Sequence, residues 1–293
     1  RRKSGKSSCQ ARKISMKKQS ALKFVKERSG SLRRNDNTKF TDIERIVCSL
    51  LSLTQAKLHS NVTTISENQK KLVNLMIARR NSGEPLAYIL KKKGFWNINV
   101  KVNRHVLVPR PETETLIEAI LDLFNEDRIT VLDLGTGSGI IALTLATERR
   151  EWEIFASDIS FKALRVASHN KDKYHANVKL IQANWLDIFK VNSFDLIISN
   201  PPYIAEREEN LKEDGLKFEP RLALVSKEKG MRDLKEICTL SYPYLKKGGR
   251  IFLEHAPWQT EKVRHYLKRS DYSDLKVIKD LNGDKRVTGA LKL

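Results

Sequence analysis

An apolar run at residues 196–198 is followed by four residues that could hold a planar nitrogen: Asn200, Pro201, Pro202 and Tyr203. An ordinary turn would explain the two prolines, because Pro is common in turns and its missing N–H suits a strand end. That alternative leaves Asn200 and Tyr203 without a role. The side-chain oxygen of Asn200 and the backbone carbonyl of Pro201 could instead accept the two hydrogens of an amide or an aromatic amine. Tyr203 could then lie flat against the planar group.

A second candidate site is the glycine-rich stretch VLDLGTGSGIIAL at residues 131–143, which reads as a strand, a tight turn and an apolar helix. Gly135, Gly137 and Gly139 would let the backbone approach a ligand closely. The spacing is GxGxG, which differs from the GxGxxG of dinucleotide binders, and no GK[ST] follows as in a P-loop. Asp133, at the strand end, could accept a hydrogen bond from a ligand amine or ammonium group. A turn that binds nothing is the alternative.

Two later strand ends carry residues that suit a nucleoside. Asp158 could bind the two hydroxyls of a ribose, as acids do at this place in dinucleotide folds, and it could also cap the next helix. Asn184 and Trp185 follow the third strand, where Trp185 could border an adenine or belong to the core. Together with Asp133 these residues predict a nucleoside with an amino-acid tail, and S-adenosylmethionine is such a ligand.

The two candidate sites together predict methylation of a planar nitrogen. The lone pair of such a nitrogen is delocalised, so two acceptors that align its N–H bonds would favour the pyramidal geometry of attack. Positioning and preorganised electrostatics could then carry the catalysis without a nucleophilic residue. Adenine in nucleic acid and the glutamine amide in proteins both fit this chemistry.

Alternating strands and helices predict the sheet that would position these residues. Strands are expected at residues 130–134, 153–157, 178–182, 194–199, 250–254, 275–279 and 287–292, and helices at 112–124, 140–147, 161–170, 232–245 and 259–268. Repeated β-α units form mostly parallel sheets, which bind ligands outside the carboxyl ends of their strands. Residues 129–293 resemble the α/β class of seven-stranded, Rossmann-like S-adenosylmethionine-dependent methyltransferases.

The remaining chain predicts a small N-terminal helical domain. Apolar spacing indicates helices between residues 40 and 80, the first opened by a capping box of Thr41 and Glu44. We expect four segments. They are a basic segment at 1–39, a helical substrate-binding domain at 40–93, a hairpin and linker at 94–111 and a methyltransferase domain at 112–293.

Charge is concentrated at the start of the chain. Residues 1–39 contain 14 Lys and Arg against two acids, which accounts for +12 of the net charge of +20. We expect this head to be disordered, to be a targeting segment for mitochondria, or to contact nucleic acid. A cytoplasmic location is the alternative. Because the chain begins with Arg1 and not with Met, we expect its true N-terminus to lie upstream.

Other compositional signals exclude several classes. Uninterrupted apolar runs are too short to cross a bilayer, so we expect no membrane partner. The three cysteines and six histidines have no metal-ligand spacing, and we expect neither a disulfide framework nor a bound metal. We expect a monomer.

Five motifs decide between the two substrate classes. They are GEPLAYIL at 83–90, VLVPRPETETLIEAIL at 106–121, EPRLAL at 219–224, LEHAPWQTEKVR at 253–264 and DLNGDKRVTG at 280–289. In this order they resemble the HemK/PrmC-type release-factor glutamine methyltransferases. The resemblance implies a peptide chain release factor as the partner and the glutamine of its Gly-Gly-Gln loop as the substrate. It also implies that the N-terminal helical domain helps to hold the release factor.

The resemblance assigns roles to individual residues. The cofactor would be bound by Asp133, Gly135, Thr136, Gly137, Ser138, Gly139, Asp158, Trp185 and Asn200, and the glutamine amide by Asn200, Pro201, Pro202 and Tyr203. Arg110 and Glu112 would brace the linker, or they would form an ordinary surface ion pair. KEKGMRDL at 227–234 departs from the family pattern, and the charged residues 206–217 are expected to form a mobile loop. An adenine-N6 methyltransferase and a non-catalytic RNA-binding protein remain the alternatives.

Overall fold

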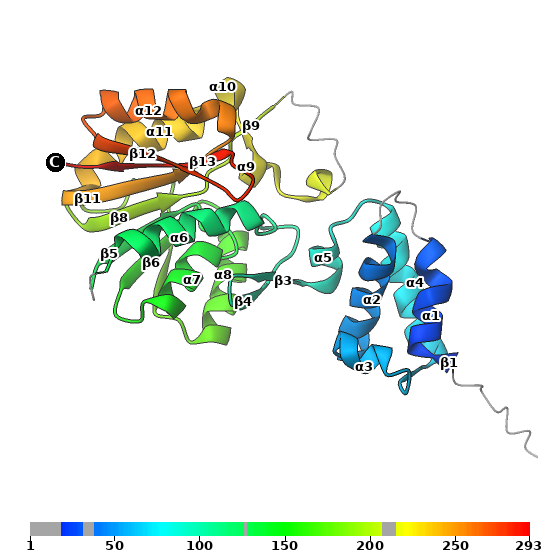
Figure 1. The fold of residues 1–293 in the computed structure, drawn as a ribbon. Coiled ribbons are helices and arrows are strands. Elements are labelled where there is room, and N and C mark those ends of the chain that lie inside the picture. Colours follow the sequence, from blue (N-terminus) through cyan, green and yellow to red (C-terminus); the bar gives the residue numbers. More distant parts are fainter. Residues whose placement is uncertain (1–18, 32–37, 126–127, 207–214) are drawn as a thin grey trace, which may run out of the picture. The chain divides into compact units, whose positions relative to one another are not determined.

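The computed structural model of this chain describes residues 19–31, 38–125, 128–206 and 215–293. The chain divides between Ser82 and Gly83 into two compact units. The N-terminal unit is helical, and the C-terminal unit contains a seven-stranded sheet (Figure 1). In the described part of the chain, no helix combines the length and apolar character needed to span a membrane.

The N-terminal unit is a small group of helices with one short strand pair. Its elements are β1 (Gln19–Ser20), α1 (Ala21–Arg28), η1 (Ser29–Ser31), α2 (Thr38–Leu51), α3 (Gln55–His59), β2 (Thr64–Ile65) and α4 (Glu67–Asn81). The strands β1 and β2 pair antiparallel. A capping box of Ser66 and Gln69 begins α4 and satisfies two of the backbone N–H groups at its start.

Two expectations for this unit are corrected. Residues 19–31 of the basic head are ordered, because α1 buries Leu22, Phe24 and Val25 in the unit. The prediction of disorder is therefore wrong there, while residues 1–18 lie outside the described residues. The first predicted helix begins at Thr38, so Thr41 is inside α2. Glu44 is no cap, since its buried carboxylate accepts hydrogen bonds from Gln55 and His59.

The C-terminal unit is built on a sheet with the strand order β12-β13-β11-β8-β5-β6-β7. The strands are β5 (Thr130–Leu134), β6 (Glu153–Asp158), β7 (Val178–Gln182), β8 (Phe194–Ser199), β11 (Leu245–Glu254), β12 (Ser273–Lys279) and β13 (Lys285–Leu291). All neighbours are parallel except β13, which runs antiparallel to both β11 and β12. The predicted fold class is confirmed.

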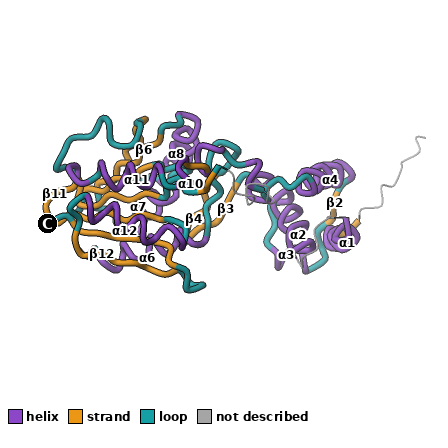
Figure 2. Tube along the Cα trace, turned by 90° about the horizontal axis from the view of Figure 1, so that it is seen from above, coloured by secondary structure: helices purple, strands orange, loops and turns teal. Residues whose placement is uncertain are grey.

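Helices cover both faces of this sheet (Figures 1 and 2). One face carries α6 (Glu114–Leu123), α7 (Ile140–Glu148) and α8 (Phe161–Tyr174), and the other carries α11 (Arg232–Leu240) and α12 (Thr260–Arg269). Alternation along β5 separates the two cores, since Val131 packs with the first group and Leu132 with the second. The helix predicted at 232–245 ends at Leu240, because Pro243 cannot continue it.

Shorter elements connect the strands of this unit. They are α5 (Leu86–Leu90), the hairpin β3 (Lys92–Phe95) and β4 (Ile98–Lys101), η2 (Pro111–Thr113), β9 (Ile204–Ala205), η4 (Leu216–Phe218), α9 (Arg221–Leu224), β10 (Val225–Ser226), α10 (Lys227–Gly230), η5 (Tyr242–Tyr244) and η6 (Pro257–Gln259). Tyr88 of α5 packs with Phe95 of the hairpin. Of the loop expected at 206–217, residues 207–214 lie outside the described part.

Strain within α10 leads to a stability prediction. Glu228 and Lys229 have left-handed backbone conformations, with φ of 53° and 56°. This conformation costs an L-residue about 1–2 kcal/mol, and Asn tolerates it better than Lys does. We expect Lys229→Asn to raise the free energy of unfolding of this unit by about 0.5 kcal/mol. Urea unfolding measures this free energy, and Lys227→Asn is the control. Equal free energies of unfolding for the two variants would contradict the strain at Lys229.

Candidate active site

A pocket opens within the C-terminal unit at the carboxyl ends of β5, β6, β7 and β8. Its wall includes Gly135, Thr136, Gly137, Ser138, Asp158, Asn184, Trp185, Asn200 and Pro202, together with linker residues His105, Val106, Leu107, Pro109, Arg110 and Thr113. The structure thus brings most of the predicted site residues to one place. Asp133, Gly139, Pro201 and Tyr203 are not part of this wall.

The glycine-rich turn forms the floor of the pocket. Its backbone N–H groups at Gly135 and Thr136 both donate to the carbonyl of Ser157, at 2.9 Å each. Gly135 has a φ of +72°, and a Cβ there would lie 3.5 Å from the Trp185 ring. Gly139 has a different role, since a Cβ added at this position would come within 3.1 Å of Leu143. It lets α7 begin against its neighbours and does not line the pocket.

Asp133 lies beneath this turn. It is completely buried, and its Oδ2 accepts hydrogen bonds from the Thr136 hydroxyl at 2.6 Å and the Ala142 N–H at 3.3 Å. Burial raises the pKa of Asp133 to about 7, although both donors favour its ionised form. Alternation along β5 points this side chain at α7. Asp133 therefore supports the turn through Thr136, which is part of the pocket wall, while its Oδ1 has no hydrogen-bond partner among the described residues.

Asp158 and Trp185 face the pocket from the next two strand ends. One carboxylate oxygen of Asp158 accepts the Gly137 N–H at 2.9 Å, and the other accepts the Ser160 N–H at 2.8 Å. Each oxygen keeps a lone pair for a further donor such as a ribose hydroxyl. Trp185 has a left-handed backbone, with φ of 48°, and also packs against the core. Both of its predicted environments, pocket and core, are thus present.

Removal of the Asp158 carboxylate should weaken cofactor binding. A hydrogen bond to a charged group contributes about 1.5–3 kcal/mol, so we expect Asp158→Ala to raise the Kd for S-adenosylmethionine by about 10–100-fold. Calorimetric titration measures this, and Asp187→Ala, an exposed change outside the pocket wall, should leave the Kd unchanged. Equal Kd values for Asp158→Ala and the parent would refute this role.

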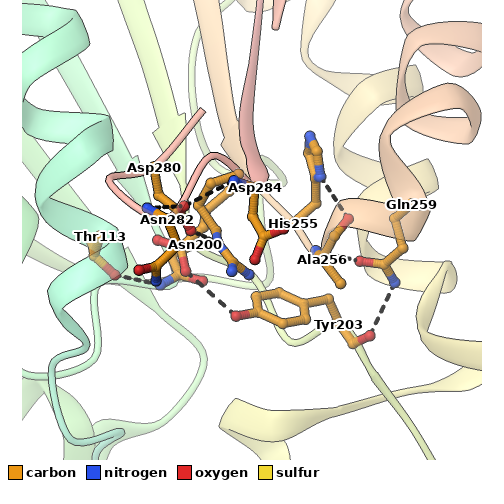
Figure 3. A network of polar contacts seen from close by, with 11 residues as sticks. Thr113, Asn200, Tyr203, His255, Ala256, Gln259, Asp280, Asn282 and Asp284 are labelled. Atoms are coloured by element: carbon orange, nitrogen blue, oxygen red, sulfur yellow. Dashed lines mark hydrogen bonds and ion pairs between the residues drawn. The ribbon is translucent and has the colours of Figure 1, made fainter. Parts of the chain in front are cut away.

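Asn200 lines the pocket, and its side-chain amide lies beside Thr113 (Figure 3). Its Nδ2 donates to the hydroxyl oxygen of Thr113 at 3.2 Å, and no described residue donates to its Oδ1. Tyr203 is half-buried, and its hydroxyl lies 3.4 Å from Oε1 of Glu254. Burial and the nearby Glu254 raise the pKa of Tyr203, so the phenol is neutral. Gln259 donates to the Tyr203 carbonyl at 3.0 Å and fixes the backbone of the motif.

The linker is held by an ion pair between Arg110 and an acid that sequence reasoning did not identify. Arg110 contacts Glu219 at 2.6 Å, and the second oxygen of Glu219 accepts the Val108 N–H at 2.9 Å. Arg110 and Glu112 form no ion pair with each other among the described residues. Glu219 is buried and lies beside Arg110, although the two residues are 109 positions apart in the chain. The EPRLAL motif contains Glu219, but spacing along the chain could not show that this residue pairs with Arg110.

Buried Asn170 is another positioning residue that sequence reasoning missed. Its amide donates to the carbonyls of Ser138 at 2.9 Å and Lys101 at 3.0 Å, and its oxygen accepts the Lys101 N–H at 2.7 Å. It therefore ties the glycine-rich turn to the hairpin. A single Asn on a predicted helix has no sequence signal that reveals this contact.

Two family models match the chain. The "Methyltransferase small domain" matches residues 112–214, and the "PrmC N-terminal domain" matches residues 26–90. The release factor glutamine methyltransferase of Salmonella typhimurium is 39% identical over 227 residues, 77% of this chain and 82% of the relative. Its namesake in Buchnera aphidicola subsp. Acyrthosiphon pisum is 36% identical over 269 residues, 91% of this chain and 96% of the relative.

The chain belongs to the release factor glutamine methyltransferase family.

Membership of this family confirms the predicted resemblance, the methyltransferase activity and S-adenosylmethionine as the cofactor. The glycine-rich turn, the free acceptor capacity of Asp158 and the Trp185 face fit that cofactor. The relatives named here are bacterial and give no support to the expected mitochondrial location.

Solved structures show the same fold at low identity. A methyltransferase from Pyrococcus furiosus has a TM-score of 0.52 and 16% identity, covering 78% of this chain and 99% of that one. A 16S rRNA methyltransferase (RsmC) of T. thermophilus, in complex with AdoMet and guanosine, has a TM-score of 0.52 and 18% identity, covering 69% of this chain and 50% of that one. At these identities the likeness to the two solved structures shows the fold alone.

Proposed function

We propose that this chain transfers a methyl group to the side-chain amide nitrogen, N5, of the glutamine in the Gly-Gly-Gln motif of a peptide chain release factor, and so supports translation termination. The observation that carries the proposal is the pocket-facing Asn200, whose Nδ2 is engaged by Thr113 and whose Oδ1 remains available. The names of the relatives supply the substrate class.

The residues of this chain would divide the work as follows. Gly135 to Gly139, Asp158 and Trp185 would hold S-adenosylmethionine, with Asp133 below them. When bound, the cofactor supplies an electrophilic methyl group. Asn200 Oδ1 and the Pro201 carbonyl would accept the two amide hydrogens and align the nitrogen. Pro202 and Tyr203 would shape the slot around the planar amide, and the excess proton would leave to solvent with or after transfer.

The domain arrangement belongs to the same proposal. We assign substrate holding to the helical segment 40–93, connection to the segment 94–111 and chemistry to residues 112–293, with the chain acting as a monomer. Residues 1–18 lie outside the described part, so the predicted nucleic-acid contact of the head stays a prediction.

An assay with labelled S-adenosylmethionine tests the proposed substrate. The parent protein is incubated separately with a release factor, with a release factor whose Gly-Gly-Gln glutamine is changed to alanine, and with adenine-containing RNA. We expect label on the first substrate alone. Label on the RNA and none on the release factor would instead establish the adenine-N6 alternative, which no structural observation favours.

A further inference from the structure

Glu254, at the end of β11, is a buried carboxylate that the proposed chemistry does not use. Its side chain is 1% exposed, and Oε2 has no hydrogen-bond partner among the described residues. Oε1 lies 3.4 Å from the Tyr203 hydroxyl. Burial of a carboxylate is unfavourable unless donors surround it, so its place beside the Asn-Pro-Pro-Tyr motif requires an explanation.

Thr113 connects this carboxylate to Asn200. The Thr113 oxygen accepts from Nδ2 of Asn200 at 3.2 Å, which leaves the Thr113 hydroxyl proton available to another acceptor. The same hydroxyl acts on Glu254 as a donor that lowers the pKa of the carboxyl. Thr113 thus interacts with both Asn200 and Glu254.

The direction of these contacts decides which end of the Asn200 amide faces the pocket. An ionised carboxylate only accepts, whereas a hydroxyl both accepts and donates. If Thr113 donates to Glu254, its oxygen is left to accept from Asn200 Nδ2, and Oδ1 turns to the pocket. If Thr113 instead donated to Oδ1, the NH₂ group would face the substrate N–H bonds and repel them.

We infer that Glu254 is a positioning residue, which orients the Asn200 amide through Thr113 and the Tyr203 ring through its hydroxyl. The inference rests on the proposed function, because the orientation of the Asn200 amide matters for a substrate whose N–H groups donate hydrogen bonds.

The surroundings of Glu254 give the inference a pH dependence. Burial raises the pKa of Glu254 to about 7, Thr113 and Arg286 lower it, Glu112 raises it and Tyr203 lowers it. Arg286 in turn contacts Asp280 at 3.1 Å. Burial lowers the pKa of the adjacent His255 to about 4, so that imidazole does not titrate near 7. A protonated Glu254 could donate to Thr113, and the methylation rate should therefore fall as the pH drops below about 7.

The variant Glu254→Gln tests the inference, because Gln keeps the shape and can donate. We expect kcat on the release factor to fall by about 10–100-fold with an unchanged Kd for S-adenosylmethionine. We also expect the decrease in methylation rate below about pH 7 to be smaller in the variant than in the parent protein. Asp133 also has a pKa of about 7, so the comparison between variant and parent is the decisive one. Glu261→Gln, an exposed change in the same motif, should match the parent.

A double-mutant cycle separates this role from simple loss of packing. If Glu254 acts through Thr113, the effect of Glu254→Gln should be much smaller in the Thr113→Val background, while Thr113→Ser should retain activity. Independent effects that multiply would overturn the inference.

A turnover-free measurement separates the inference from the proposed function. The side-chain amide ¹⁵N–¹H signals of Asn200 should move in Glu254→Gln and stay in place in Glu261→Gln. Unchanged signals in Glu254→Gln would refute the role of Glu254, even if the release factor proved not to be the substrate. A parent protein inactive on the release factor, with the expected signal change, would contradict only the substrate.

Discussion

Replacing Asn200 with alanine is expected to reduce kcat for methylation of the release factor by at least about 10²–10³-fold. Loss of one preorganised hydrogen-bonding group at a reacting centre has an effect of this size in other enzymes. The loss concerns the acceptor that aligns the amide nitrogen, while Asp158 and the glycine-rich turn remain intact. The Kd for S-adenosylmethionine should therefore change little.

Single-turnover kinetics and calorimetric titration measure the two quantities separately. Asn282→Ala is a matched control, because Asn282 is exposed and its side chain forms no hydrogen bond in the described structure. A near-parental kcat for Asn200→Ala would show that Oδ1 does not align the substrate. A large rise in the Kd for the cofactor would show that Asn200 binds the cofactor and would contradict a role in substrate alignment alone.

Replacing Gly230 with alanine should disturb the Asn-Pro-Pro-Tyr motif through the backbone of Tyr203. A Cβ at Gly230 would lie 2.2 Å from the Tyr203 carbonyl oxygen, and the φ of +82° is itself unfavourable for alanine. Gln259, which donates to the carbonyls of both residues at 3.0 Å, would lose its geometry. We expect kcat to fall by about 10²-fold, since a displacement of 1 Å can have that effect.

The same change should lower the free energy of unfolding by about 2–4 kcal/mol, from the backbone conformation and the steric contact together. Gly248→Ala separates the two, because Gly248 has a φ of +78° with no atom within 4 Å of the added Cβ. That control should lose about 1–2 kcal/mol and keep its kcat. A parental kcat for Gly230→Ala would show that the motif tolerates displacement of the Tyr203 carbonyl.

The strand-loop-helix pattern was enough to locate the site. Hydrophobic runs with a helix between them predict a parallel sheet, and the residue after each run must then lie at its carboxyl edge. Asp158, Trp185 and Asn200 were found in this way, and the structure places all three on one pocket wall. Local propensity was less reliable at element ends, as Thr38 and Leu240 show, because capping and tertiary contacts decide where a helix stops.

Contacts between distant segments could not be predicted in the same way. Arg110 and Glu112 were expected to brace the linker or to form a surface ion pair, whereas Arg110 binds Glu219, because only the fold brings EPRLAL beside the linker. Asp133 was predicted to accept a hydrogen bond from the ligand, which stays a prediction; spacing along the chain did not indicate that its Oδ2 accepts from Thr136 and from the backbone of Ala142.

The sequence by itself therefore determined the fold class, the family and the place of Asn200 at the pocket, since these depend on order and residue type along the chain. Only the tertiary structure decided how the Asn200 amide is oriented. Glu254, Thr113 and Gly230 come from three separate segments, and their contacts with Asn200 and Tyr203 depend on distances of a few ångströms that no spacing along the chain encodes.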